Sequence, residues 1–159
     1  MNEQELRAKN QAAVEQYFQL HGADRLRLFT ENGAKTIPFS PSHLKVFSWR
    51  GKDKLRANFE FNAKDLASWE FRDMEIIPAL DPGFFLVKTI GEGTHARGTY
   101  YKNLYLFTFR VEDGLIKEVT EYMNPLNGMI ADGFEIPAQY LWDGSKPPLD
   151  GLACVDYSE

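Results

Sequence analysis

Apolar and polar residues alternate most clearly between residues 103 and 125, where the pattern predicts two paired strands. Aromatic or aliphatic side chains occupy every second position of the first strand, at Tyr105, Phe107, Phe109 and Val111. The segment EDG, residues 112–114, separates the two runs, and its glycine can take the left-handed backbone conformation of a hairpin turn. We therefore expect a hairpin with one aromatic, buried face.

The length of this turn decides where Glu121 points. A three-residue loop would set Tyr105 opposite Glu121 and leave the carboxylate on the aromatic face. A two-residue Asp-Gly turn would move Glu121 to the other face, because a shift of one residue reverses every side chain of a strand. We favour the three-residue loop, since the shorter turn would set two cations, Arg110 and Lys117, opposite each other.

The remaining elements follow from the same kind of periodicity. Amphipathic spacing predicts helices over residues 3–20, 23–30 and 52–66. The second of these helices is expected to stop at the segment 31–33. Strands are expected over residues 34–40, 44–50, 68–78, 83–92, 99–111 and 115–123, with a short helix between 125 and 139. Helices followed by a run of antiparallel strands indicate an α+β fold, a cone-shaped, curved antiparallel sheet wrapped around helices. Residues 1–138 would form this single domain, and residues 139–159 an irregular acidic C-terminal extension.

Composition narrows the function classes. A chain of 159 residues with a net charge of −5 and no cluster of Lys or Arg is not expected to bind nucleic acid. The polar N-terminus does not resemble a secretory signal, and no apolar run reaches the length of a membrane span. The single Cys154 excludes an internal disulfide and fits a reducing compartment. We expect a cytoplasmic protein with no membrane partner.

Glu121 is the first candidate for chemistry. An unpaired, ionised carboxylate on an apolar face is strongly disfavoured, so this one should be partnered, protonated or catalytic. If it lines a pocket, desolvation should raise its pKa, which suits general acid/base catalysis near neutral pH. The alternative is a solvated carboxylate, or a structural one that binds an Arg or Tyr side chain.

The helix at 52–66 carries the second candidate. Asn58 and Asn62 interrupt a stripe that otherwise consists of Leu55, Phe59 and Leu66. Buried asparagines need hydrogen-bond partners. They could face a ligand across the cavity from Glu121 and polarise a substrate carbonyl, although neither can transfer a proton. Equally, they could cap the carbonyl groups of loops.

Other polar residues carry weaker signals. Asn10 raises the same question on the first helix. Arg25 or Arg27 could bind a substrate carboxylate through two hydrogen bonds, and the alternative is ordinary solvation at the surface.

Metal and cofactor sites are not expected. The histidines His21, His43 and His95 share no ligand spacing, and His95 is expected in a surface loop between strands. The glycine-rich segment 91–98 precedes a strand, whereas a phosphate-binding loop should open a helix.

Several blocks of the sequence resemble the phenazine biosynthesis protein A/B family. They are KNQAAVEQY (9–17), RLFTENG (27–33), RGKDKL (50–55), GEG (91–93), GLIKEVTEYMNP (114–125) and GFEIP (133–137). The family belongs to the ketosteroid-isomerase-like superfamily, also called nuclear transport factor two-like or SnoaL-like. The resemblance therefore implies a cone-shaped α+β barrel, usually dimeric, with a cavity for a small molecule.

The family promotes condensation of two aminocyclohexenone carboxylic acid molecules and assists proton transfer during imine formation. By this resemblance the acidic catalytic residue of the family matches Glu121, while Asn58 and Asn62 stand where the family has a histidine and a serine. The residues expected to bind substrate are Asn58, Asn62, Arg25, Tyr105 and Phe107.

Three functions remain open. The first is a cofactor-independent acid/base enzyme that condenses or isomerises a cyclic or aromatic keto acid. The second is a non-catalytic binding or carrier protein that kept the cavity and lost the family histidine. The third is an interaction protein whose open sheet forms a dimer. A homodimer is expected in any case, because the outer sheet face would carry Leu104, Leu106, Ile116 and Tyr122.

Overall fold

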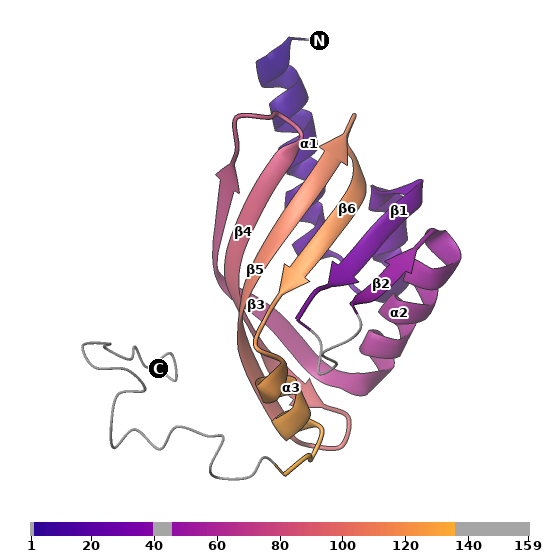
Figure 1. Ribbon diagram of the computed structural model, residues 1–159, viewed down its shortest axis with the longest axis vertical. Coiled ribbons are helices and arrows are strands. Elements are labelled where there is room, and N and C mark those ends of the chain that lie inside the picture. Colours follow the sequence, from indigo (N-terminus) through magenta and orange to yellow (C-terminus); the bar gives the residue numbers. More distant parts are fainter. Residues whose placement is uncertain (1, 40–45, 136–159) are drawn as a thin grey trace, which may run out of the picture.

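The computed structural model describes residues 2–39 and 46–135 (Figure 1). Along the chain, the helices and strands are α1 (Glu3–Gln19), the 3-10 helix η1 (Gly22–Leu28), β1 (Phe29–Ile37), β2 (Phe47–Arg50), α2 (Lys52–Asp65), β3 (Leu66–Pro78), β4 (Phe84–His95), β5 (Tyr100–Glu112), β6 (Leu115–Tyr122) and α3 (Pro125–Ala131). Of the described residues, none belongs to a helix long and apolar enough to span a membrane.

One curved sheet of six strands forms the body of the fold, in the order β2-β1-β6-β5-β4-β3. Figure 1 shows α1 and α2 on the same side of this sheet, with the long strands β3, β4 and β5 bending past them. The predicted α+β cone is confirmed. The sheet is nevertheless mixed, because β1 and β6 pair in parallel while every other pair is antiparallel. No hairpin links β1 to β6, so turn geometry does not fix their relative direction.

The β5–β6 hairpin differs from the expected register. Glu112 pairs with Leu115 across a two-residue turn, in which Asp113 (φ 51°) and Gly114 (φ 80°) both have positive φ, as an Asp-Gly type I′ turn requires. The predicted three-residue loop is therefore wrong. A bulge just after the turn shifts the register by one residue, so Glu121 lies opposite Phe107 and stays on the buried aromatic face.

The same turn and bulge change which side chains face the core at the start of β6. Ile116 is fully buried, and its neighbour Leu115 is exposed instead. The expectation of Ile116 on the outer face is wrong for this reason. Leu104 and Leu106 are exposed as expected, and Tyr122 is half-buried.

Two boundaries also move. Residues 31–33, expected to end the second helix, lie inside β1, and the helix before them is a short 3-10 helix. The second predicted strand begins only at Phe47, and residues 40–45 lie outside the described part. The predicted boundary between residues 138 and 139 also lies outside it and stays a prediction.

The core lies between α1, α2 and the concave side of the sheet. Its largest fully buried side chains are Tyr17, Phe29, Phe59, Phe85, Phe107 and Phe109. Asn10 is also buried, and its Nδ2 donates to the Pro82 carbonyl (3.1 Å) while its Oδ1 accepts from the Gly114 N–H (2.8 Å). Asn10 thus holds two turns to α1 and has a structural role.

Candidate active site

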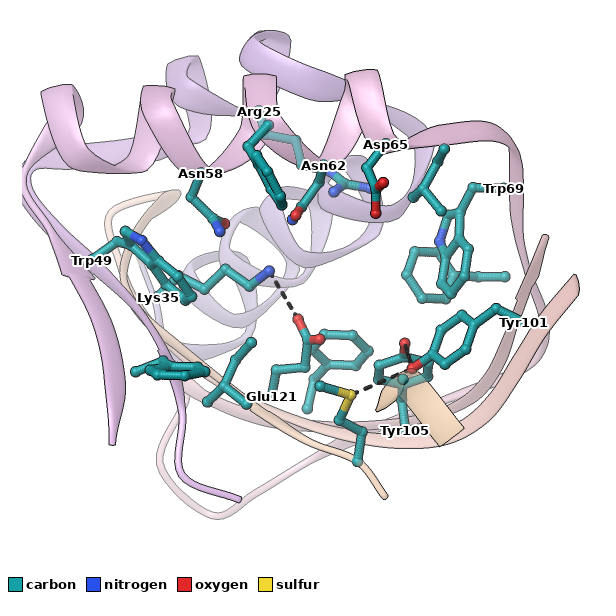
Figure 2. Close-up of a pocket in the computed structure, with 18 of the residues that line it drawn as sticks. Arg25, Lys35, Trp49, Asn58, Asn62, Asp65, Trp69, Tyr101, Tyr105 and Glu121 are labelled. Atoms are coloured by element: carbon teal, nitrogen blue, oxygen red, sulfur yellow. Dashed lines mark hydrogen bonds and ion pairs between the residues drawn. The ribbon is translucent and has the colours of Figure 1, made fainter. Parts of the chain in front are cut away.

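A cavity of about 400 Å³ lies between α2 and the sheet. All residues predicted to form the site contribute to its walls: Glu121, Asn58, Asn62, Arg25, Tyr105 and Phe107. Figure 2 shows that α2 supplies the amides of Asn58 and Asn62 from one side, while Glu121 reaches in from the sheet opposite. The hairpin bulge is what keeps Glu121 on this side.

Glu121 is paired with a lysine that sequence reasoning missed. The Lys35 Nζ lies 3.0 Å from Glu121 Oε2, and the two residues are 4% and 9% exposed. Burial alone would lower the pKa of Lys35, but the charge of Glu121 and the hydrogen bond to it raise that pKa above its ordinary value. Lys35 therefore keeps its proton near neutral pH, and the partnered alternative for Glu121 applies.

Aromatic packing completes the surroundings of Lys35. Trp49 is its register partner on β2, and the Lys35 Nζ lies 5.9 Å from the centre of the indole ring. A cation at this distance from an aromatic face is attracted by the ring. Trp49 therefore helps hold the ammonium group in place beside Glu121.

Asn58 carries an unsatisfied oxygen. The residue is 7% exposed, and its Oδ1 has no hydrogen-bond partner among residues 2–39 and 46–135. Asn62, one turn further along α2, is half-buried. Within the same residues, neither side chain hydrogen-bonds a loop carbonyl, so both amides remain available to a ligand.

The guanidinium group of Arg25 is held in place by contacts with Tyr17 and Phe59. Its Nε donates to the Tyr17 carbonyl (2.9 Å), and its guanidinium carbon lies 4.7 Å from the centre of the Tyr17 ring and 5.9 Å from that of Phe59. These contacts fix the plane of the guanidinium group at the cavity wall. Arg27 is exposed and does not line the cavity.

Two linked tyrosines from β5 form another part of the wall. The hydroxyl groups of Tyr101 and Tyr105 are 2.8 Å apart, and Asn103 Nδ2 donates to Tyr101 Oη (2.9 Å). Burial raises the pKa of Tyr101 and places that of Tyr105 well above its ordinary value. Both phenols therefore stay neutral and offer hydrogen bonds rather than charge.

His95 is not in a surface loop, and that expectation is wrong. It is the last residue of β4, 8% exposed, and lines the cavity. Its Nδ1 lies 3.0 Å from Oδ2 of Asp65, the last residue of α2. The strand ends three residues later than predicted, and this extension carries the imidazole inward.

Asp65, His95 and Asp132 lie close together, with one potential ligand atom each within 4.8 Å of one another. The guanidinium of Arg97 pairs with Asp132 and approaches His95 Nδ1 to 3.5 Å. The fixed positive charge of Arg97 already offsets one of the two carboxylates and opposes the binding of a further cation. We therefore assign no metal to it, and the expected absence of a metal site stays a prediction.

The residues that were missed share one property. Lys35, Asp65, His95 and Tyr101 meet only through long-range packing. In β1 the residues Gly33, Ala34 and Lys35 are buried in succession, so alternation did not identify the lysine. Aromatic residues occupy odd-numbered positions of β5, and extending this pattern toward the start of the strand could have indicated Tyr101 as a residue of the buried face.

Comparisons with known proteins identify the family of the chain. A sequence model of the family described as phenazine biosynthesis protein A/B matches residues 1–144. The chain is 36% identical to phenazine biosynthesis protein PhzB1 of Pseudomonas aeruginosa, over 84% of this chain and 86% of that protein. It is 33% identical to PhzB of Pseudomonas fluorescens, over the same shares.

Solved structures show the same fold. The crystal structure of a phenazine biosynthesis-related protein (phzb2) from Pseudomonas aeruginosa has a TM-score of 0.78 and 29% identity, covering 90% of this chain and 91% of that one. A putative polyketide cyclase from Xanthomonas campestris has a TM-score of 0.64 and 18% identity, covering 79% and 98%, and is similar in fold. The chain therefore belongs to the phenazine biosynthesis protein A/B family, whose members have a role in small-molecule biosynthesis.

Proposed function

We propose that the protein is a cofactor-independent acid/base enzyme that condenses or isomerises a cyclic keto acid, with Glu121 as the proton shuttle. The single observation that carries this proposal is the Lys35–Glu121 pair in the cavity wall. Replacing a buried ion pair by apolar side chains is often neutral or stabilising. A pair of this kind beside an open cavity is therefore better explained by chemistry than by stability.

The chemistry follows from the two charges. The Glu121 carboxylate takes a proton from a carbon next to the substrate carbonyl, and the electrons of the broken C–H bond move onto the carbonyl oxygen. Lys35 then loses its original counter-ion and gains the new oxyanion in its place, so the net charge in the cavity does not change. Glu121 returns the proton to the substrate at the end of the step, and no oxidant or cofactor is needed.

Arg25 gives the substrate class. Its guanidinium is held by the Tyr17 carbonyl through Nε, which leaves the terminal nitrogens to face a ligand. A planar guanidinium pairs best with a carboxylate, through two parallel hydrogen bonds. The Asn58 oxygen would accept a hydrogen bond from an amino or hydroxyl group of the same molecule.

The second candidate is a non-catalytic binding or carrier protein. It is favoured by Asn58, which stands where the family resemblance places a histidine and which cannot transfer a proton. Such a protein would hold the same keto acid in the same cavity. The two candidates differ in whether Glu121 moves protons.

The test is deuterium exchange into 3-oxocyclohexane-1-carboxylate in D₂O, followed by NMR, together with binding of the same probe by calorimetry. We expect Glu121→Gln to lower the catalysed exchange rate about 100-fold and to change affinity little. Glu118→Gln is the matched control, because Glu118 lies on the same strand, opposite Arg110, outside the cavity. Binding without exchange by the wild type would favour the carrier, and normal exchange by Glu121→Gln would contradict the role of Glu121.

We also propose that two copies associate through the outer face of the sheet. Leu104 and Leu106 are 37% and 40% exposed there, and the half-buried Tyr122 pairs with Leu106 on the neighbouring strand. Exposed apolar residues on a sheet face favour a cover, and a symmetric partner supplies one.

A further inference from the structure

The cavity contains a second pair of groups suited to proton transfer. His95 ends β4 and Asp65 ends α2, so two elements far apart in the sequence bring the imidazole and the carboxylate together. The distance from His95 Nδ1 to Asp65 Oδ2 is 3.0 Å, and both residues line the cavity. Nothing in the chemistry of the Lys35–Glu121 pair uses them.

The contact with Asp65 orients the imidazole. An ionised carboxylate accepts a hydrogen bond, and Asp65 Oδ2 lies closer to Nδ1 (3.0 Å) than the Arg97 donor does (3.5 Å). The proton of the neutral ring therefore lies on Nδ1 and the lone pair lies on Nε2. Among residues 2–39 and 46–135, no side chain or backbone group hydrogen-bonds His95 Nε2. The lone pair is therefore free to accept a proton from a bound molecule.

Charged and polar groups surround His95. Three ionisable groups besides Asp65 face His95: Arg97 in the turn after β4, Asp132 at the end of α3, and Tyr101 of β5, whose ring centre is 5.8 Å from that of His95. Arg97 pairs with Asp132, and this leaves Asp65 to His95. One guanidinium and two carboxylates therefore surround the imidazole.

This pair enters the cavity from a different part of the sheet than Glu121. Glu121 is the register partner of Phe107, whereas His95 adjoins the start of β5, where Thr94 pairs with Tyr100. The two groups therefore approach a bound molecule from different positions in the cavity wall.

We propose that His95, positioned by Asp65, is a second proton-transfer site that works independently of Glu121 on a keto acid bound at its end of the cavity, which rests on the function proposed above. Nε2 takes a proton from a carbon beside the carbonyl, and the C–H electrons form the enolate. The imidazolium returns its proton to the enolate carbon and restores the keto form. Asp65 remains ionised throughout and acts as a positioning residue.

The first test measures the tautomer of His95 by nitrogen-detected NMR of the imidazole, in buffer that contains EDTA so that no metal ion holds the ring. We expect the proton on Nδ1 in the wild type. Asp65→Asn, which is isosteric, should move the proton to Nε2 because the amide can donate to Nδ1. His21, exposed at the start of η1, is the internal control and should not change. A proton on Nε2 of the wild-type His95 would overturn the inference.

The second test uses deuterium exchange into 3-oxocyclohexane-1-carboxylate with Glu121→Gln as the parent. We expect its residual rate to exceed that of buffer, and His95→Gln to lower the residual at least tenfold, toward the buffer rate, while His21→Gln leaves it unchanged. If the residual equals the buffer rate or survives His95→Gln, the second site is refuted while the role of Glu121 stands. Absence of exchange in the wild type would instead reject the proposed enzyme and this site with it.

Discussion

Lys35 and Glu121 lie on neighbouring parallel strands, and their charged groups meet 3.0 Å apart although neither is the register partner of the other. Lys35 pairs with Val119 in the ladder, and Glu121 pairs with Phe107 on the far side of β6. The ion pair is therefore diagonal across β1 and β6. It links a strand placed early in the chain to the last strand of the sheet, and its strength depends on that parallel contact.

Lys35→Met should destabilise the protein by about 3–5 kcal/mol at neutral pH, because it leaves the Glu121 carboxylate buried without a counter-charge. Urea unfolding followed by circular dichroism measures this loss. The loss should shrink as the pH falls, since protonation removes the unpaired charge.

Two comparisons sharpen that result. The double variant Lys35→Met/Glu121→Gln should recover most of the stability, because no unpaired charge remains. Lys117→Met should cost less than about 1 kcal/mol, because Lys117 and its partner Glu112 are both more than half exposed. Equal losses for Lys35→Met and Lys117→Met would contradict the buried pair.

Stability should also fall as the pH rises above about 10. Burial opposes the charged form of Lys35, but the charge of Glu121, the hydrogen bond to it and the influence of Tyr17 together raise the pKa of Lys35 from its ordinary value of 10.5. Burial raises the pKa values of Tyr101 and Tyr105 above 10.0. All three groups hold their protons to higher pH in the folded protein than in the unfolded chain, so alkali favours the unfolded chain.

Thermal unfolding between about pH 8 and pH 11 tests this sign. Tyr105→Phe should give a shallower decline, since one of the three groups is removed. Lys64→Met, at an exposed position of α2, is the control and should keep the wild-type slope. A melting temperature that stays constant up to pH 11 would contradict the assignment.

The hairpin explains why the position of Glu121 could be predicted although its register could not. Alternation predicted the strands and the aromatic face, and the Asp113-Gly114 pair was visible as a turn signal. The bulge after Arg110 is not visible in alternation, and it compensates for the shorter turn. The prediction thus placed Glu121 on the correct face of the sheet although the predicted register was wrong. The same wrong register explains why Ile116 was expected on the outer face.

Contacts between distant segments explain the rest. The stripe on α2 was sufficient to predict Asn58 and Asn62, because helical spacing is local. The position of Lys35 beside Glu121 depends on the contact between β1 and β6, and the position of His95 beside Asp65 depends on the contact between β4 and α2. Long stretches of chain separate the two members of each pair of elements. No local pattern encodes these contacts, so the charged partners in the cavity emerged only from the structure.

Gly91→Ala should reduce the cavity. A Cβ at Gly91 would lie 2.5 Å from the Trp69 ring and 2.7 Å from the Tyr105 ring, so one of these walls must move. Overpacking of this kind costs about 1–3 kcal/mol. Gly128→Ala is the matched control, because in the described part of the chain its added Cβ meets nothing within 4 Å beyond its own stretch of α3, although Gly128 also lines the cavity.

Calorimetric binding of 3-oxocyclohexane-1-carboxylate and thermal unfolding give the two readouts for Gly91→Ala. We expect weaker binding and a lower melting temperature, with neither change in Gly128→Ala. Unchanged binding in Gly91→Ala would place the ligand away from Trp69 and Tyr105.

Sedimentation velocity at micromolar concentration should show the wild-type protein as a dimer. Leu106→Lys places a charge in the middle of the outer sheet face, between Lys88 on β4 and Tyr122 on β6, and should shift the protein to monomer. Burial of that charge in an interface, next to a like charge on the neighbouring strand, is strongly disfavoured. Leu80→Lys is the control, because Leu80 is 97% exposed in the turn between β3 and β4 and should leave the dimer intact. A wild type that sediments only as a monomer would show that this sheet face is not covered by a second copy.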